Sequence, residues 1–148
     1  MNPSRFHIIL ADDDEDDCML FEDALNEFPL PIHLTIVHNG EQVMELLVKK
    51  SEQLPDLLFL DLNMHRKNGF ECLAEIKQSE KLKQLPVIIL STSLEKDVIN
   101  LLYKNGAQYY IRKPNEFSQL KKAIHQVLTD LSQANLSQPP KEKFVLSQ

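Results

Sequence analysis

The chain has 148 residues, of which 43% are hydrophobic, so it can build one domain with a buried core but not a second domain of ordinary size. Its formal charge of −6 argues against nucleic acid as a partner. The two cysteines, Cys18 and Cys72, are too few and too far apart in the sequence to suggest a zinc cluster. With no signal peptide and no apolar run long enough to span a bilayer, we expect a cytoplasmic protein that does not enter a membrane.

Short apolar runs alternate along the chain with stretches in which apolar residues recur at helical spacing. Strands are expected at 6–11, 32–37, 57–60, 87–90 and 108–112. Helices are expected at about 14–27 and about 40–50, from about 69, around 98–102, and at 117–131. This alternation predicts an α/β fold, a (βα)5 doubly wound parallel sheet with right-handed crossovers.

The periodic pattern ends near residue 131, so we expect a folded domain over residues 5–131. Residues 132–148 are rich in Ser, Gln, Pro and Lys, with a small apolar patch at Phe144 to Leu146. This composition predicts a flexible C-terminal tail with a frayed end, too short for an output domain.

Reactive side chains follow four of the predicted strands. They are Asp12, Asp13, Asp61, Ser91 and Lys113. The carboxyl ends of parallel strands are where ligands bind in open α/β sheets, so we expect these side chains at one edge. A carboxylate that ends a buried strand is costly unless something binds it. Three acids, a hydroxyl and a lysine therefore predict a magnesium-assisted phosphorylation site.

The order of these motifs resembles the response-regulator receiver domain, the phosphoacceptor half of two-component signalling in bacteria. It runs from an acidic pair through Asp61-x-x-Met64 and Ser91 to Lys113-Pro114. The resemblance covers about residues 5–131 and implies a flavodoxin-like receiver with strand order 2-1-3-4-5. A receiver without an output domain is similar to the small regulators paired with phytochrome-like or hybrid sensor histidine kinases.

The resemblance implies a role for each acidic residue in phosphorylation and metal binding. Asp61 would accept a phosphoryl group from a sensor histidine kinase or a histidine phosphotransfer protein. Asp13 and Asp61 would ligate Mg²⁺ directly, and Asp12 would bind it through water. The backbone carbonyl of Asn63 would supply another oxygen to the metal.

Three other residues would stabilise and report the phosphorylated state. Lys113, which in the family commonly precedes Pro114 through a cis bond, would place a positive charge on the phosphoryl oxygens. Ser91 would hydrogen-bond the phosphoryl group, and Tyr110 matches the family's aromatic switch. Tyr110 is expected at the sheet edge, flanked by the fourth and fifth helices. That face would bind a partner or a second copy of the chain, as in a homodimer.

Two positions depart from the family pattern. His65 stands where the family usually has proline after the methionine, and Thr92 stands where many receivers have alanine or glycine. Both are expected to change the lifetime of the phosphorylated state. Without the proline, the loop that carries Asn63 would be looser at His65, and the Thr92 side chain would shield Asp61.

Other interpretations of these residues remain open. Taken singly, Asp12 and Asp13 could cap the first helix, Ser91 could be an ordinary strand-end hydroxyl and Lys113 a surface lysine. The chain could also be a phosphorylation-independent interaction module, although retention of all the motif residues argues against this. A dehalogenase-type phosphohydrolase needs a second Asp where this chain has Asn63, so we expect no enzyme activity beyond slow self-dephosphorylation.

Overall fold

The computed structural model describes residues 6–49, 53–64, 66–133 and 137–146. Its strands are β1 (Phe6–Ala11), β2 (Ile32–Val37), β3 (Leu57–Asp61), β4 (Val87–Ser91), β5 (Tyr109–Arg112) and β6 (Val145–Leu146). Its helices are α1 (Glu15–Asn26), α2 (Gly40–Lys49), α3 (Gly69–Gln78), α4 (Lys96–Lys104) and α5 (Phe117–Ser132), followed by a 3-10 turn η1 (Lys141–Lys143). In the described part of the chain, no helix is both long and apolar enough to cross a bilayer.

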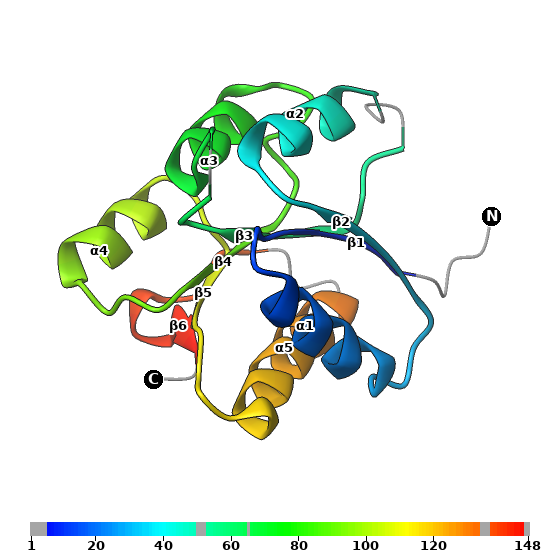
Figure 1. Ribbon diagram of the computed structural model, residues 1–148. Helices are drawn as coiled ribbons and strands as arrows, with labels where there is room; N and C mark the ends of the chain where they lie inside the picture. Colours follow the sequence, from blue (N-terminus) through cyan, green and yellow to red (C-terminus); the bar gives the residue numbers. More distant parts are fainter. Residues whose placement is uncertain (1–5, 50–52, 65, 134–136, 147–148) are drawn as a thin grey trace.

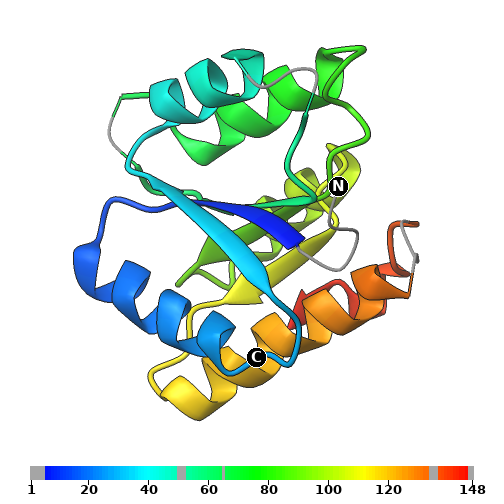
Figure 2. The ribbon, with the colours of Figure 1, turned by 90° about the vertical axis from the view of Figure 1, so that its right-hand side faces the viewer.

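All the strands are parallel, and they form one sheet in the order β2-β1-β3-β4-β5-β6. Helices α1 and α5 cover one face, and α2, α3 and α4 cover the other (Figure 1). The view in Figure 2 shows α1 and α5 side by side beneath the sheet. The predicted doubly wound fold and the 2-1-3-4-5 order are confirmed, with β6 added beyond β5.

The central strands are buried on both faces because helices cover both faces of the sheet. Every residue of β3 and β4 is buried. Alternate side chains enter two separate hydrophobic clusters: Leu58 packs with the residues of α2, α3 and α4, whereas Phe59 packs with those of α1 and α5. The continuous apolar run therefore serves two cores, which accounts for its lack of polar alternation.

The register of the sheet aligns the ends of neighbouring strands. Ala11 of β1 pairs with Leu60, Asp61 of β3 pairs with Leu90, and Ser91 of β4 pairs with Arg112. Residues that follow these positions therefore emerge together at the carboxyl edge of the sheet. The candidate site lies at this edge.

The C-terminal segment 137–146 is folded against the domain, so the prediction of a flexible tail is wrong for these residues. Strand β6 pairs in parallel with β5, and the Tyr110 backbone N–H donates to the Phe144 carbonyl at 3.0 Å. Phe144 is fully buried, with its ring 5.0 Å from that of Tyr103 and 6.3 Å from that of Tyr110. Phe144 packs in the same hydrophobic cluster as Leu58, and burial of its ring stabilises the attachment of this segment. The polar composition of the segment did not indicate this packing.

Candidate functional site at the carboxyl end of the sheet

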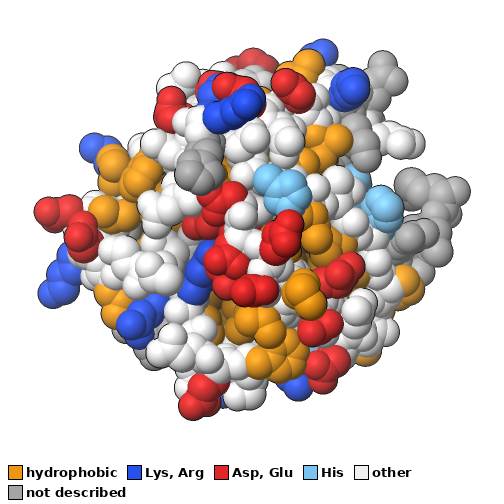
Figure 3. All heavy atoms as spheres, in the orientation of Figure 1, with side chains coloured by type: hydrophobic (Ala, Val, Ile, Leu, Met, Phe, Trp, Pro, Cys, Tyr) orange, Lys and Arg blue, Asp and Glu red, His pale blue; other side chains and the backbone are white. Residues whose placement is uncertain are grey.

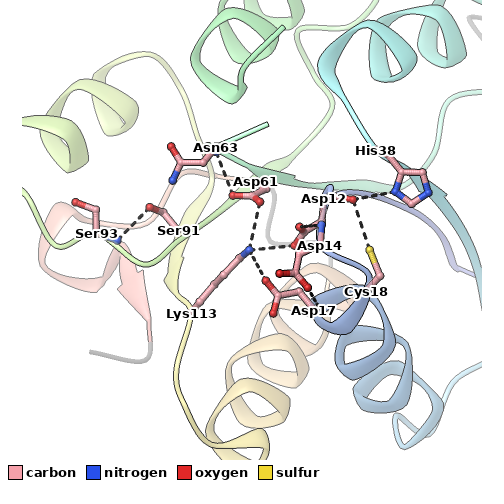
Figure 4. Close-up of polar contacts among 10 residues, drawn as sticks. All are labelled: Asp12, Asp14, Asp17, Cys18, His38, Asp61, Asn63, Ser91, Ser93 and Lys113. Atoms are coloured by element: carbon pink, nitrogen blue, oxygen red, sulfur yellow. Dashed lines mark hydrogen bonds and ion pairs between the residues drawn. The ribbon is translucent and has the colours of Figure 1, made fainter. Parts of the chain in front are cut away.

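Asp12, Asp61 and Lys113 meet at the carboxyl edge of the sheet although they are far apart in the sequence (Figure 4). The Lys113 Nζ lies 3.1 Å from the Asp12 Oδ2 and 3.3 Å from the Asp61 Oδ2. Both carboxylates are almost fully buried, with side-chain exposures of 2% and 6%. The structure therefore brings together these three residues that the sequence placed at one edge.

A carboxylate cluster suited to a divalent cation lies beside Lys113 at the same edge of the sheet. One oxygen from each of Asp12, Asp13 and Asp61 can be chosen so that all three lie within 4.8 Å of one another. Figure 3 shows acidic side chains gathered in the middle of the face at this end of the molecule. Hard cations such as Mg²⁺ and Mn²⁺ prefer carboxylate oxygens, so the donor set fits the predicted metal.

Asp61 is a buried carboxylate with an altered proton affinity. Its pKa is raised from 3.8 to about 6. Burial is the main cause, the charge of Lys113 opposes the increase, and the charge of Asp12 adds to it. The backbone N–H of Asn63 donates to the Asp61 Oδ1 at 3.2 Å and also favours the ionised form. At pH 7 the side chain is therefore mostly ionised, as a nucleophile must be.

The peptide bond between Lys113 and Pro114 is trans. No cis bond occurs among the described residues, so the implied cis bond to Pro114 is wrong for this structure. The trans form is the lower-energy isomer of an X–Pro bond, and the Lys113 ammonium contacts Asp12 and Asp61 without the cis geometry. Burial alone would lower the pKa of Lys113, but the hydrogen bond to Asp17 and the charges of Asp61 and Asp12 raise it overall.

Asp17 is a third partner of Lys113, and sequence reasoning missed it. Its Oδ2 lies 2.9 Å from the Lys113 Nζ. In the sequence this residue is one of six consecutive acids and is typical of a solvated helix start. Its place in the first turn of α1 is shared with Glu15 and Asp16, so no signal in the sequence singles it out.

The cap of α1 is Asp14, so the interpretation of Asp12 and Asp13 as capping residues is wrong. The Asp14 side chain accepts a hydrogen bond from the backbone N–H of Asp17 at 3.0 Å. Asp12 instead accepts from the backbone N–H of Asp14 through Oδ1 and from Lys113 through Oδ2. The two carboxylates therefore have separate roles: Asp14 caps α1, and Asp12 binds Lys113.

Ser91, at the end of β4, is connected to Tyr110 on β5 by hydrogen bonds through Ser93. Ser91 is buried, and its Oγ accepts from the backbone N–H of Ser93 at 3.1 Å. The Tyr110 hydroxyl donates to the Ser93 carbonyl at 2.6 Å. Burial raises the pKa of Tyr110, and the neighbouring Ser91 side chain opposes that increase. Thr92 lies between the two serines in sequence and is exposed.

The expected position of Tyr110 at the edge of the sheet is wrong. Strand β6 covers the outer side of β5, and the Tyr110 side chain is fully buried. The Tyr103 hydroxyl on α4 donates to the Pro139 carbonyl at 2.7 Å, and the Gln138 Nε2 donates to the Ala107 carbonyl at 2.6 Å. The chain's own segment 137–146 therefore covers part of the face that was expected to receive a partner.

Close backbone approaches hold residues 67–69 next to the end of β3 and the start of α2. A Cβ added at Gly69 would lie 2.7 Å from the Asp61 carbonyl oxygen, so only glycine allows α3 to begin so close to the end of β3. Asn68 and Glu71 form a capping box at the start of that helix. The Gly40 backbone N–H donates to the Lys67 carbonyl at 3.0 Å and ties the loop to α2. His65, the first departure from the family pattern, lies outside the described residues.

Comparison with known proteins agrees with this architecture. A family model described as "Response regulator receiver domain" matches residues 8–125. Response regulator Rcp1 of Synechocystis sp. is 33% identical over 127 residues, which cover 83% of this chain and 86% of Rcp1.

Solved structures give the same result. The phosphorylated cyanobacterial phytochrome response regulator RcpA superimposes with a TM-score of 0.81 at 34% identity, covering 92% of this chain and 99% of RcpA. The Mn²⁺-bound form of response regulator Rcp1 superimposes with a TM-score of 0.76 at 30% identity, covering 91% of this chain and 99% of that structure.

Proposed function

Because the chain belongs to the response regulator receiver domain family, we propose that it accepts a phosphoryl group on Asp61 in two-component signalling. The donor would be a sensor histidine kinase or a histidine phosphotransfer protein. The observation that carries the proposal is the buried Asp61 carboxylate, which lies close to the carboxylates of Asp12 and Asp13 and contacts the Lys113 ammonium. A phosphorylation-independent module would not need this costly arrangement of charges.

The proposed reaction is a transfer between two anions. An Asp61 Oδ attacks phosphorus and forms an O–P bond, while the bond from phosphorus to the donor's histidine nitrogen or to acetate breaks. The leaving group keeps the electron pair of that bond. Lys113 would hold a phosphoryl oxygen and so lower the charge repulsion in the transition state; the 3.3 Å contact of its Nζ with the Asp61 Oδ2 supports this role.

We propose that the acidic cluster holds Mg²⁺. Asp13 and Asp61 would ligate it directly, and Asp12 would bind it through water. The backbone carbonyl of Asn63 would be the remaining ligand from the protein. When bound, the cation would neutralise charge on the transferring phosphoryl group. The carboxylate geometry supports this assignment, and Rcp1, which has been solved with Mn²⁺, is a relative with a divalent cation.

Output would pass from the phosphoryl group through Ser91 and Tyr110 to the α4–β5–α5 face. The hydrogen bonds that join these two residues through Ser93 support such a route. A partner or a second copy of the chain would contact a surface that includes segment 137–146. Signalling could then proceed by conformational change or by onward transfer of the phosphoryl group. The tuning roles of Thr92 and His65 stay predictions.

The test is direct uptake of a phosphoryl group. Wild-type protein incubated with acetyl phosphate and Mg²⁺ should gain one phosphoryl group by intact mass, and the same sample with excess EDTA should gain none. EDTA removes the cation but leaves the carboxylates in place, so it isolates the metal requirement. No uptake with Mg²⁺ would contradict the phosphoacceptor function, and equal uptake with EDTA would contradict the metal assignment.

A further inference from the structure

Lys113 has as many carboxylate partners as it has protons to donate. Its Nζ contacts oxygens of Asp17 at 2.9 Å, Asp12 at 3.1 Å and Asp61 at 3.3 Å. A lysine ammonium has three N–H donors and no acceptor, so all its donors have a partner. Figure 4 shows the Asp17 side chain extending from the first turn of α1 to the ammonium, on the side away from Asn63.

The three partners differ in their access to water. The side chains of Asp12 and Asp61 are 2% and 6% exposed, whereas that of Asp17 is 39% exposed. Releasing a buried carboxylate from Lys113 would leave an uncompensated charge in the protein interior. Releasing Asp17 would only return a half-exposed carboxylate to water, which costs far less.

We propose that Asp17 is a positioning residue that holds Lys113 in the unphosphorylated protein and competes with the phosphoryl group for it. This inference rests on the proposed function. A phosphoryl group on Asp61 needs an N–H donor from Lys113, and every donor has a carboxylate partner beforehand. Asp17 is the partner that gives way because it is the one that water can solvate. The carboxylate of Asp17 therefore makes the phosphorylated state harder to form.

The sequence offers a matched control for this idea. Asp16 neighbours Asp17 in the first turn of α1, is exposed, and has no ion pair with Lys113 among the described residues. Asp16→Asn and Asp17→Asn change the net charge equally, but only the second removes a contact with the lysine. Their comparison separates competition for Lys113 from general repulsion of an anionic donor.

The experiment measures the affinity of each variant for beryllofluoride in the presence of Mg²⁺, together with the rate of phosphorylation by acetyl phosphate. Asp17→Asn should bind beryllofluoride about two- to fivefold more tightly and react faster by the same factor. This factor corresponds to the free energy of one partly exposed ion pair. Asp16→Asn and the conservative Asp17→Glu should both stay within about 1.5-fold of the wild type, because an exposed charge is screened and a longer carboxylate still reaches Lys113. In a Lys113→Met background, Asp17→Asn should no longer change the beryllofluoride affinity.

Three results would overturn the inference: an unchanged or weaker affinity in Asp17→Asn, an equal gain in Asp16→Asn, or a gain that persists without Lys113. A wild type that takes up neither beryllofluoride nor phosphate would instead remove the proposed function on which the inference rests. The wild-type sample therefore distinguishes the two failures.

Discussion

At pH 7 and without Mg²⁺, the Asp61→Asn variant is expected to have a free energy of unfolding about 2–3 kcal/mol higher than that of the wild type. Burial raises the pKa of Asp61 from 3.8 to about 6, so keeping this carboxylate ionised in the folded protein destabilises the fold. Asparagine has a similar shape and no charge to desolvate. Urea unfolding followed by circular dichroism measures the difference.

The pH dependence gives this prediction its sharpest form. Because the pKa of Asp61 is higher in the folded than in the unfolded chain, the folded state binds the proton more tightly, and the wild type loses stability as the pH rises from about 4 to about 6. The advantage of Asp61→Asn should therefore be largest above pH 6 and nearly vanish below about pH 4. The exposed Asp16→Asn serves as a control with the same loss of charge. An advantage that is independent of pH, or a variant less stable than the wild type at pH 7, would contradict the assigned pKa.

The Phe144→Ala variant is expected to lose about 3 kcal/mol of the free energy of unfolding. Its ring is fully buried against Tyr103 and Tyr110, and truncation of a buried phenylalanine removes apolar contact and leaves a cavity. The amide of Tyr110 should also exchange faster, because it donates to the Phe144 carbonyl through the β5–β6 pairing. Urea unfolding and amide hydrogen exchange measure the two effects.

Lys143 provides the control for this change, because it precedes Phe144 in the sequence and is exposed. Lys143→Ala should stay within about 0.5 kcal/mol of the wild type. A Phe144→Ala protein as stable as the wild type, with unchanged exchange at Tyr110, would mean that segment 137–146 does not pack on the domain.

The central part of the fold could be predicted from the sequence because its signals are local. Leu57 to Leu60 forms an unbroken apolar run, so the buried strand and the carboxylate of Asp61 at its end follow from a few adjacent residues. The positions of Asp12 and Lys113 follow in turn, since the carboxyl ends of parallel strands share one edge. The order of the strands came from the family resemblance, and the sheet bears it out.

The features that sequence reasoning missed depend on contacts between distant residues. Strand β6 has two residues in a polar segment, and it forms because Phe144 packs against Tyr103 on α4. The same pairing covers Tyr110, which is why that residue is not at an edge. Asp17 is indistinguishable from its acidic neighbours until the direction of the first turn of α1 is known. Only the folded chain shows that it reaches Lys113.

The central claim is that Asp61 is the phosphoacceptor, and intact mass followed by peptide mapping of wild type and Asp61→Asn after treatment with acetyl phosphate and Mg²⁺ tests it most directly. The Asp61→Asn variant is expected to be folded, so a missing phosphoryl group would report on chemistry and not on stability. The wild type should carry one phosphoryl group, on the peptide that contains Asp61, and Asp61→Asn should carry none. Phosphorylation of Asp61→Asn to the wild-type level, or a wild-type phosphoryl group on another peptide, would contradict the account.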